Sequence, residues 1–351
     1  MTSTIINGGL GSIYNQKLFG HEQIEEFLSQ YYCSGKMHHA LIFQGAEGIG
    51  KATLGLRYAC HIFQNPEFRY APSKIYPPDI NSPIVRQMAS LSLHDFLYLS
   101  YQVDNKTGKL RTVITVDEIR RIRNFLSLTA NNGGWRIVMI DPADGMNRNA
   151  SNALLKSLED PPKKVLFILI SHVSGMILPT IRSRCLSIKF KTLSENNICK
   201  AIENLGIKLS QEKRSILINA SNGSVTRAIK ILNYGCDKII SAYADLMRIR
   251  NKNHTRQMMQ QIADELANND KYVVFNFFTE FILEDTYKRA KEAALLGQLE
   301  EADQIVEIYH SIKNRIDSFF IYHLDRQQTI LYLLEKAIDC CNIYCRDFYD
   351  N

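Results

Sequence analysis

The sequence predicts a mixed fold, in which an α/β domain built on a parallel sheet precedes two all-α regions. Short apolar runs alternate with helical patterns through the first half of the chain, a glycine-rich loop follows the first run, and strand-like segments stop near residue 190. Strands that alternate with helices favour a parallel sheet with helices on both faces. We therefore expect an α/β domain over 1–190, a small three-helix domain over 191–236 and a helical domain over 237–351.

Each element follows from the spacing of apolar residues. The expected strands are the short apolar runs at 38–45, 96–100, 135–141, 165–171 and 185–190. Helical periodicity appears at 51–63, 116–130 and 152–162, and a proline-rich stretch at 65–83 is expected to form a loop. Beyond residue 190 we expect short helices at 194–207, 210–223 and 224–235, the first two opening with serine caps, and then long amphipathic helices.

Composition limits the class of protein. With 351 residues and roughly 100–200 residues per domain, two or three domains are expected. The net charge of +6 permits contact with nucleic acid but does not demand it. The N-terminal stretch lacks the pattern of a signal peptide, and no apolar run is long enough to span a membrane. We expect a cytoplasmic protein without a membrane partner.

The eight cysteines are scattered and include no Cys-x-x-Cys pair, so no zinc is expected and a reducing compartment is indicated. Cys340, Cys341 and Cys345 are close enough in sequence to suggest a metal or redox cluster. Free cysteine usually packs as a small apolar residue, so we interpret these three as helix residues.

The stretch GAEGIGK at 45–51 has the spacing of a phosphate-binding loop between a predicted strand and a predicted helix. Glycines at 45, 48 and 50 let backbone amides turn toward a phosphate at the helix N-terminus, and Lys51 would reach the terminal phosphates. The alternative to a phosphate loop is a glycine-rich turn that precedes a lysine by chance. The candidate nucleotide-binding residues are Gly45, Gly48, Gly50, Lys51, Thr53 and Asp141.

Two groups that an ATPase of this type needs are missing. Ala52 stands where a serine or threonine would hold magnesium, and Thr53 is rotated by about 100° on the helix. Asp141 ends a predicted strand and would serve the metal, but Pro142 follows it where a glutamate base is usual. A positioned base contributes on the order of 10²–10⁴ in rate. We expect a vestigial site that binds ATP or ADP at most, requires no cofactor and holds no metal.

Arg184 lies in the sequence Ser-Arg-Cys, just before the last predicted strand. An arginine at that place is poorly positioned for its own phosphate loop, but it can serve the nucleotide of a neighbouring chain. The structural alternative is a surface arginine paired with Asp160 or Glu159.

Several motifs appear in a characteristic order: HHALIFQGAEGIGKATL, VDEIRRI, GGWRIVMIDPADGMNRNASNALLKSLEDPP, LFILISH, LPTIRSRC and NGSVTRAIKIL. Their order resembles the delta-prime subunits of bacterial DNA polymerase III clamp loaders, which are AAA+ proteins, over about residues 17–235. The resemblance implies an AAA+ phosphate-loop domain, a helical lid and a C-terminal collar. It also implies that Arg184 is an arginine finger acting in trans.

The partners implied are other clamp-loader subunits of the gamma/tau and delta types, with the sliding clamp and primed DNA within the complex. In such a complex the chain would be a component of a DNA-directed DNA polymerase, a nucleotidyltransferase. Active loader subunits carry an arginine in a GS-x-R-x-A element, where this chain has Thr226, and Arg227 is shifted by one position. Residues 61–115 contain no cysteine, so the four-cysteine zinc module of some delta-prime proteins is missing. The expected function is a stator subunit that does not hydrolyse ATP.

Two other functions remain open at this point. One is an active gamma/tau-type ATPase in which Thr53 and Asp144 replace the lost groups, and the other is a DNA-repair AAA+ module. Arg120, Arg121 and Arg123 either meet DNA phosphates or form a solvated helix face with their acidic neighbours.

Overall fold

The computed structural model describes residues 13, 17–103, 111–127, 134–173, 175–207, 210–248, 252–268 and 271–344. The chain divides into two compact units. One comprises Met1–Ile207 with Gly223–Thr226, and the other comprises Lys208–Asn222 with Arg227–Asn351. The division into three domains at residues 190 and 236 stays a prediction.

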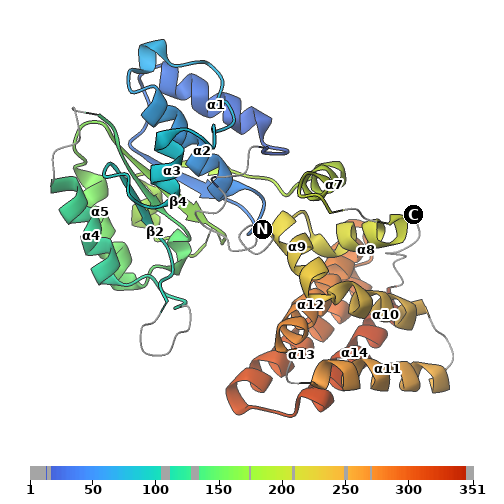
Figure 1. Ribbon diagram of the computed structural model, residues 1–351. Coiled ribbons are helices and arrows are strands. Elements are labelled where there is room, and N and C mark those ends of the chain that lie inside the picture. The colour runs from blue at the N-terminus through green and yellow to red at the C-terminus, as the bar shows by residue number, and fades with distance from the viewer. Residues whose placement is uncertain are drawn as a thin grey trace. The chain divides into compact units, whose positions relative to one another are not determined.

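A five-stranded parallel sheet forms the centre of the first unit, as the sequence predicts (Figure 1). Its strands are β1 (Ala40–Gln44), β2 (Phe96–Leu99), β3 (Arg136–Ile140), β4 (Val165–Ser171) and β5 (Leu186–Lys189), in the order β2-β3-β4-β1-β5. Strand β1 pairs with β4 on one side and with β5 on the other, with Leu41 opposite Ile168 and Leu186. The carboxyl ends of all five strands therefore lie at one edge of the sheet.

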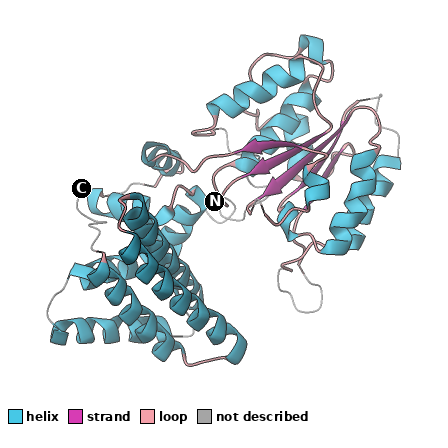
Figure 2. Cartoon of the chain, turned by 180° about the vertical axis from the view of Figure 1, so that it is seen from behind, coloured by secondary structure: helices cyan, strands magenta, loops and turns pink. Residues whose placement is uncertain are grey.

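Helices cover both faces of this sheet (Figure 2). Leu41 and Phe43 of β1 pack in the core with α1 (Glu22–Cys33), α2 (Lys51–Gln64) and α3 (Pro83–Ala89). Ala40 and Ile42 pack on the other face with α4 (Val116–Ser127), α5 (Arg148–Glu159) and α6 (Pro179–Arg182). Strands β1, β3 and β4 are buried along their whole length, which is why they appear as nearly continuous apolar runs in the sequence. The edge strand β5 differs, because Ser187 and Lys189 are exposed.

Some helix boundaries differ from the prediction. Helix α5 begins at Arg148 rather than 152, because the Asn147 side chain accepts a hydrogen bond from the Ala150 amide at 2.8 Å and caps the helix. The stretch expected to be a loop includes a short 3-10 helix at Phe68–Tyr70, and Pro83 starts α3 at a position that proline favours. Ser194 precedes α7 (Glu195–Asn204), but its side chain makes no capping hydrogen bond, so that predicted cap is wrong. Residues 128–130 of the predicted helix at 116–130 lie outside the described part of the chain.

The second unit is helical, as predicted for the chain after residue 190. Its helices are α8 (Gln211–Ser221), α9 (Val225–Tyr234), α10 (Cys236–Arg248), α11 (Lys252–Ala267), α12 (Tyr272–Leu295), α13 (Leu299–Tyr322) and α14 (Arg326–Ile343), and the first two residues of α9 belong to the other unit. Among the described residues, no helix combines the length and the apolar character needed to cross a membrane. Cys340 and Cys341 are buried in α14, while Cys345 falls outside the described residues.

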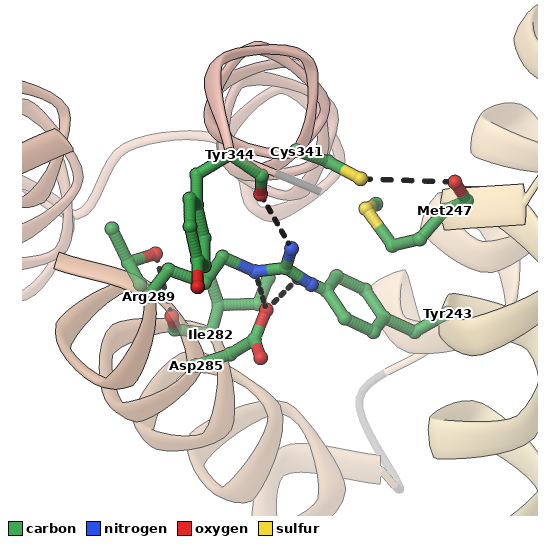
Figure 3. A network of polar contacts seen from close by, with 8 residues as sticks. Tyr243, Met247, Ile282, Asp285, Arg289, Cys341 and Tyr344 are labelled. Carbon is green, nitrogen blue, oxygen red and sulfur yellow. Dashed lines mark hydrogen bonds and ion pairs between the residues drawn. The ribbon is translucent and has the colours of Figure 1, made fainter. Parts of the chain in front are cut away.

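A buried ion pair joins three helices of this unit (Figure 3). The Arg289 side chain is 2% exposed, and its Nε lies 3.0 Å from Asp285 Oδ2 one turn earlier on α12. The same carboxylate oxygen accepts a hydrogen bond from the Tyr243 hydroxyl of α10 at 2.8 Å, and Arg289 Nη1 donates to the Tyr344 carbonyl oxygen just beyond α14 at 3.1 Å. Burial alone would lower the pKa of Arg289, but the adjacent Asp285 carboxylate outweighs it and holds that pKa above its usual value.

We predict that Arg289→Ala lowers the free energy of unfolding by about 3–5 kcal/mol, because it leaves Asp285 as a buried charge without its partner. The matched control is Lys336→Ala, which removes a partly exposed ion pair with Asp339 and should cost less than about 1 kcal/mol. Denaturant unfolding followed by helical circular dichroism measures both. Equal, small effects would contradict a stabilising role for the network.

Candidate functional site

The phosphate loop connects β1 to α2 and brings four predicted residues together. Gly45 follows β1, and Gly48 and Gly50 adopt φ angles of +74° and +104°. These left-handed conformations strain other residues, so the glycines are what allow the tight path of the loop. Gly50 is the N-cap of α2, and Lys51 is its first residue.

Lys51 is turned back onto this loop. Its side chain is buried, and Nζ donates hydrogen bonds to the carbonyl oxygens of Gly45, at 2.6 Å, and Ala46. Burial lowers the pKa of Lys51 to about 8, although the negative charges of Asp141, Asp144 and Glu47 act in the opposite direction.

Asp141 lies directly after β3, at the sheet edge that carries the phosphate loop. Its Oδ2 accepts a hydrogen bond from the Tyr98 hydroxyl at 2.9 Å, and burial raises the pKa of Asp141. Asp144, three residues on, accepts hydrogen bonds from the backbone amides of His172 at 3.0 Å and Val173 at 3.3 Å. Asp144 therefore holds the segment that follows β4.

Two histidines at this edge are not singled out by the sequence reasoning. His172 follows β4, and its Nδ1 is buried without a hydrogen-bond partner; burial, with Lys51 as a further cause, lowers the pKa of His172. His21 precedes α1, and its Nε2 lies 2.7 Å from the Ile49 carbonyl oxygen of the phosphate loop. The place of His172 directly after a buried parallel strand was a usable signal, whereas nothing near His21 in the sequence pointed to the loop.

The first turn of α9 lies against the phosphate loop. The Gly48 carbonyl oxygen accepts from the backbone amides of Val225 at 3.0 Å and Thr226 at 3.4 Å. A Cβ added at Gly48 would come within 2.5 Å of Thr226 Cβ and of Ser224 Oγ. The side chain of Thr226 therefore touches the loop.

Arg227 is directed elsewhere. It forms an ion pair with Glu284 of α12, and its guanidinium carbon lies 5.2 Å from the centre of the Phe277 ring. Successive helix residues point about 100° apart, so a shift of one position in the sequence moves the guanidinium into the helical unit. Arg227 is therefore directed away from Gly48.

Arg184 lies at the opposite edge of the sheet. It precedes β5, and because Leu186 pairs with Leu41, Arg184 is level with position 39 at the amino end of β1. The phosphate loop begins at Gly45, six residues further along β1, or about 20 Å at the rise of a strand. Arg184 Nη2 is 3.0 Å from Glu159 Oε1, and Nη1 donates to the Thr180 carbonyl oxygen at 3.0 Å. Of the two acidic partners considered from the sequence, Glu159 is the one that Arg184 contacts.

The arginines of α4 form part of an exposed helix face. Arg120 pairs with Asp117 at 2.6 Å, and both side chains are more than two thirds exposed. Arg121 and Arg123 are also exposed, whereas Glu118 is buried and accepts hydrogen bonds from Thr115. Contact of these arginines with DNA stays a prediction.

A parallel sheet with a phosphate loop after β1, an aspartate after β3 and a helical C-terminal region defines an AAA+ protein. Residues 20–194 match the model of the family described as DNA polymerase III, delta subunit. The chain is 36% identical to DNA polymerase III subunit delta' of Pseudomonas aeruginosa over 149 residues, which are 42% of this chain and 41% of the relative. The chain is a member of the DNA polymerase III clamp-loader family.

Gamma subunits are also similar. The identity to DNA polymerase III subunit gamma of Buchnera aphidicola subsp. Schizaphis graminum is 28% over 223 residues, which are 62% of this chain and 57% of the relative. Among solved structures, a DNA polymerase III gamma subunit-related protein of Thermotoga maritima superposes with a TM-score of 0.46 at 17% identity, covering 90% of this chain and 98% of that one. The matched region spans about two fifths of the delta' relative and somewhat over half of the gamma relative.

The lowered pKa of Lys51 predicts the sign of a pH dependence of stability. The pKa of Lys51 is lowered from 10.5 to about 8, so between these values the unfolded chain binds more protons than the folded chain. Its contribution to stability therefore increases as the pH rises through this window. Between pH values of about 7.5 and 9.5, the free energy of unfolding of the wild type should increase relative to that of Lys51→Met. Denaturant titration at each pH measures this difference. Parallel pH profiles would contradict the lowered pKa of Lys51.

The contact between Gly48 and α9 is also testable. Gly48→Ala should cost at least about 1 kcal/mol more than Gly206→Ala, because it adds a steric clash to the backbone strain. Gly206 is a matched control in the same unit, with a φ of +78° and no atom within 4 Å of an added Cβ. Hydrogen exchange of the Val225 and Thr226 amides should be faster in Gly48→Ala alone. Equal costs and unchanged exchange would contradict the close approach.

Proposed function

We propose that this chain is a delta-prime-type stator subunit of a DNA polymerase III clamp loader. In this role it does not hydrolyse ATP but presents Arg184 to the ATP site of a neighbouring subunit. The complex, with gamma/tau-type and delta subunits, loads the sliding clamp onto primed DNA at the expense of ATP. The observation that carries the proposal is the location of Arg184 at the sheet edge opposite its own phosphate loop.

The distance between Arg184 and the phosphate loop is the physical reason why Arg184 cannot act on a nucleotide in its own chain. A guanidinium stabilises phosphoryl transfer only when it contacts the phosphate oxygens directly, and an arginine finger then contributes about 10³–10⁵ in rate. A separation of about 20 Å along β1 exceeds the reach of an arginine side chain several-fold. Arg184 therefore serves a nucleotide only if another chain carries it.

The composition of the chain's own phosphate loop supports the stator function. Ala52 has no hydroxyl for magnesium, Pro142 offers no base, and Thr226 stands beside Gly48 without a positive charge. These three differences affect metal binding, water activation and charge stabilisation, which are separate contributions to hydrolysis. We propose that the loop binds ATP or ADP without turnover at most, and that the chain needs no cofactor.

The zinc module of some delta-prime proteins has no counterpart in the residues present here. The segment after α2 contains no cysteine and is held by hydrogen bonds from α1 instead. The Tyr32 hydroxyl donates to the Asn65 carbonyl oxygen, and the Ser29 hydroxyl donates to the Ser73 carbonyl oxygen. These contacts fix the segment without a metal, so we propose that the chain carries no zinc.

An active gamma/tau-type subunit is the second candidate. It is favoured by the greater length of the similarity to gamma, 62% of this chain against 42% for delta'. Two observations weigh against it. Thr53 is buried in α2, and backbone hydrogen bonds to both oxygens of the Asp144 carboxylate hold it against the segment after β4.

Substitution of Arg184 tests the proposal in the reconstituted complex. We predict that Arg184→Ala lowers the ATPase activity by a measurable share while assembly stays intact, because one site loses its arginine finger. The chain itself should keep its stability within about 1 kcal/mol, since the pair with Glu159 is half-exposed.

The matched control is Arg182→Ala, an exposed arginine two residues earlier that should leave the ATPase activity unchanged. Steady-state phosphate release and gel filtration of the complex provide the two measurements. Full activity in an assembled Arg184→Ala complex would remove Arg184 from the mechanism.

A further inference from the structure

The Arg184 guanidinium is held at two points by groups from two different elements. Nη2 lies 3.0 Å from Glu159 Oε1 at the end of α5, and Nη1 donates to the Thr180 carbonyl oxygen of α6 at 3.0 Å. The side chain is nevertheless 38% exposed. A guanidinium has five N–H groups, so two contacts on one side leave other donors for a ligand.

The core fixes the backbone that carries each anchor. Leu158, next to Glu159, is 1% exposed and packs beneath the sheet, and its carbonyl oxygen accepts a hydrogen bond from His39 Nε2 at 3.0 Å. Ile181, next to Thr180, is fully buried in the same core cluster. The backbone positions of Glu159 and Thr180 are therefore set by the fold, and the Glu159 carboxylate reaches Arg184 from a fixed starting point at the end of α5.

We propose that Glu159 is a positioning residue for Arg184, which it holds in the orientation that meets the phosphates of a neighbouring subunit's nucleotide. This inference rests on the proposed function of Arg184. A free arginine side chain loses much rotational freedom when it docks, and an anchor that restricts it beforehand reduces that loss. Glu159 thus acts through the guanidinium and does not touch the nucleotide.

The strength of the ion pair fits this function. A half-exposed ion pair is weak and is screened by salt, so it orients a side chain without sequestering it. The phosphates of a nucleotide carry more negative charge and form stronger, bidentate contacts with a guanidinium. Arg184 therefore keeps its charge available while Glu159 limits the directions in which it points.

The test compares Arg184→Ala, Glu159→Ala, Glu159→Gln, Asp160→Ala and the double variant of Arg184 and Glu159 in the reconstituted complex. Turnover at the site that Arg184 serves should fall about threefold to tenfold in Glu159→Ala, the range expected for restricting one flexible side chain. The loss should appear in kcat with KM unchanged. Glu159→Gln keeps an acceptor oxygen and should recover most of the activity, and Asp160→Ala, an exposed acidic neighbour, should match the wild type.

The outcomes separate this inference from the function on which it depends. If Arg184→Ala retains full activity, the proposed function fails. If Arg184→Ala loses activity but Glu159→Ala matches or exceeds the wild type, only the positioning function fails. A further loss from Glu159→Ala in the Arg184→Ala background, or an equal loss in Asp160→Ala, would show that Glu159 acts independently of Arg184 and would overturn the inference.

Discussion

The parallel pairing of β1 with β4 and β5 is the constraint on which the rest of the structure depends. It places the carboxyl ends of the strands at one edge, where the phosphate loop, Asp141 and His172 meet. The same pairing places Arg184, which precedes β5, at the other edge. A chain folded in this way cannot bring its own arginine to its own phosphate loop, so the proposed role of Arg184 requires a second subunit.

The phosphate loop keeps its shape through contacts that do not depend on hydrolysis. Lys51 binds the loop carbonyls, His21 contacts Ile49, and the first turn of α9 donates two amides to Gly48. These interactions stabilise the turn between β1 and α2 even though Ala52 cannot hold magnesium. The loop is thus part of the core of the α/β unit, and its shape does not depend on ATP hydrolysis.

The sequence was sufficient for the strands and for the location of the loop, because β1, β3 and β4 are buried along their whole length and the glycine spacing is distinctive. The sequence was insufficient where helix boundaries or side-chain partners depend on contacts that its patterns do not reveal. The Asn147 cap makes α5 begin earlier than the apolar pattern predicts. The contact between Thr226 and Gly48 joins residues that are far apart in the chain. Arg184 had two acidic candidates for a partner, and only the three-dimensional position of the end of α5 selects Glu159 over Asp160.

We propose that this chain contributes an arginine to ATP hydrolysis but does not hydrolyse ATP itself. The most direct measurement uses a reconstituted complex in which the phosphate-loop lysine of every partner subunit has been replaced, so that the site around Lys51 is the one intact phosphate loop. All arginine fingers remain present in this complex. The account predicts no ATP turnover above background with magnesium present, whereas turnover near about 1 s⁻¹, at the low end of typical enzyme rates, would contradict it.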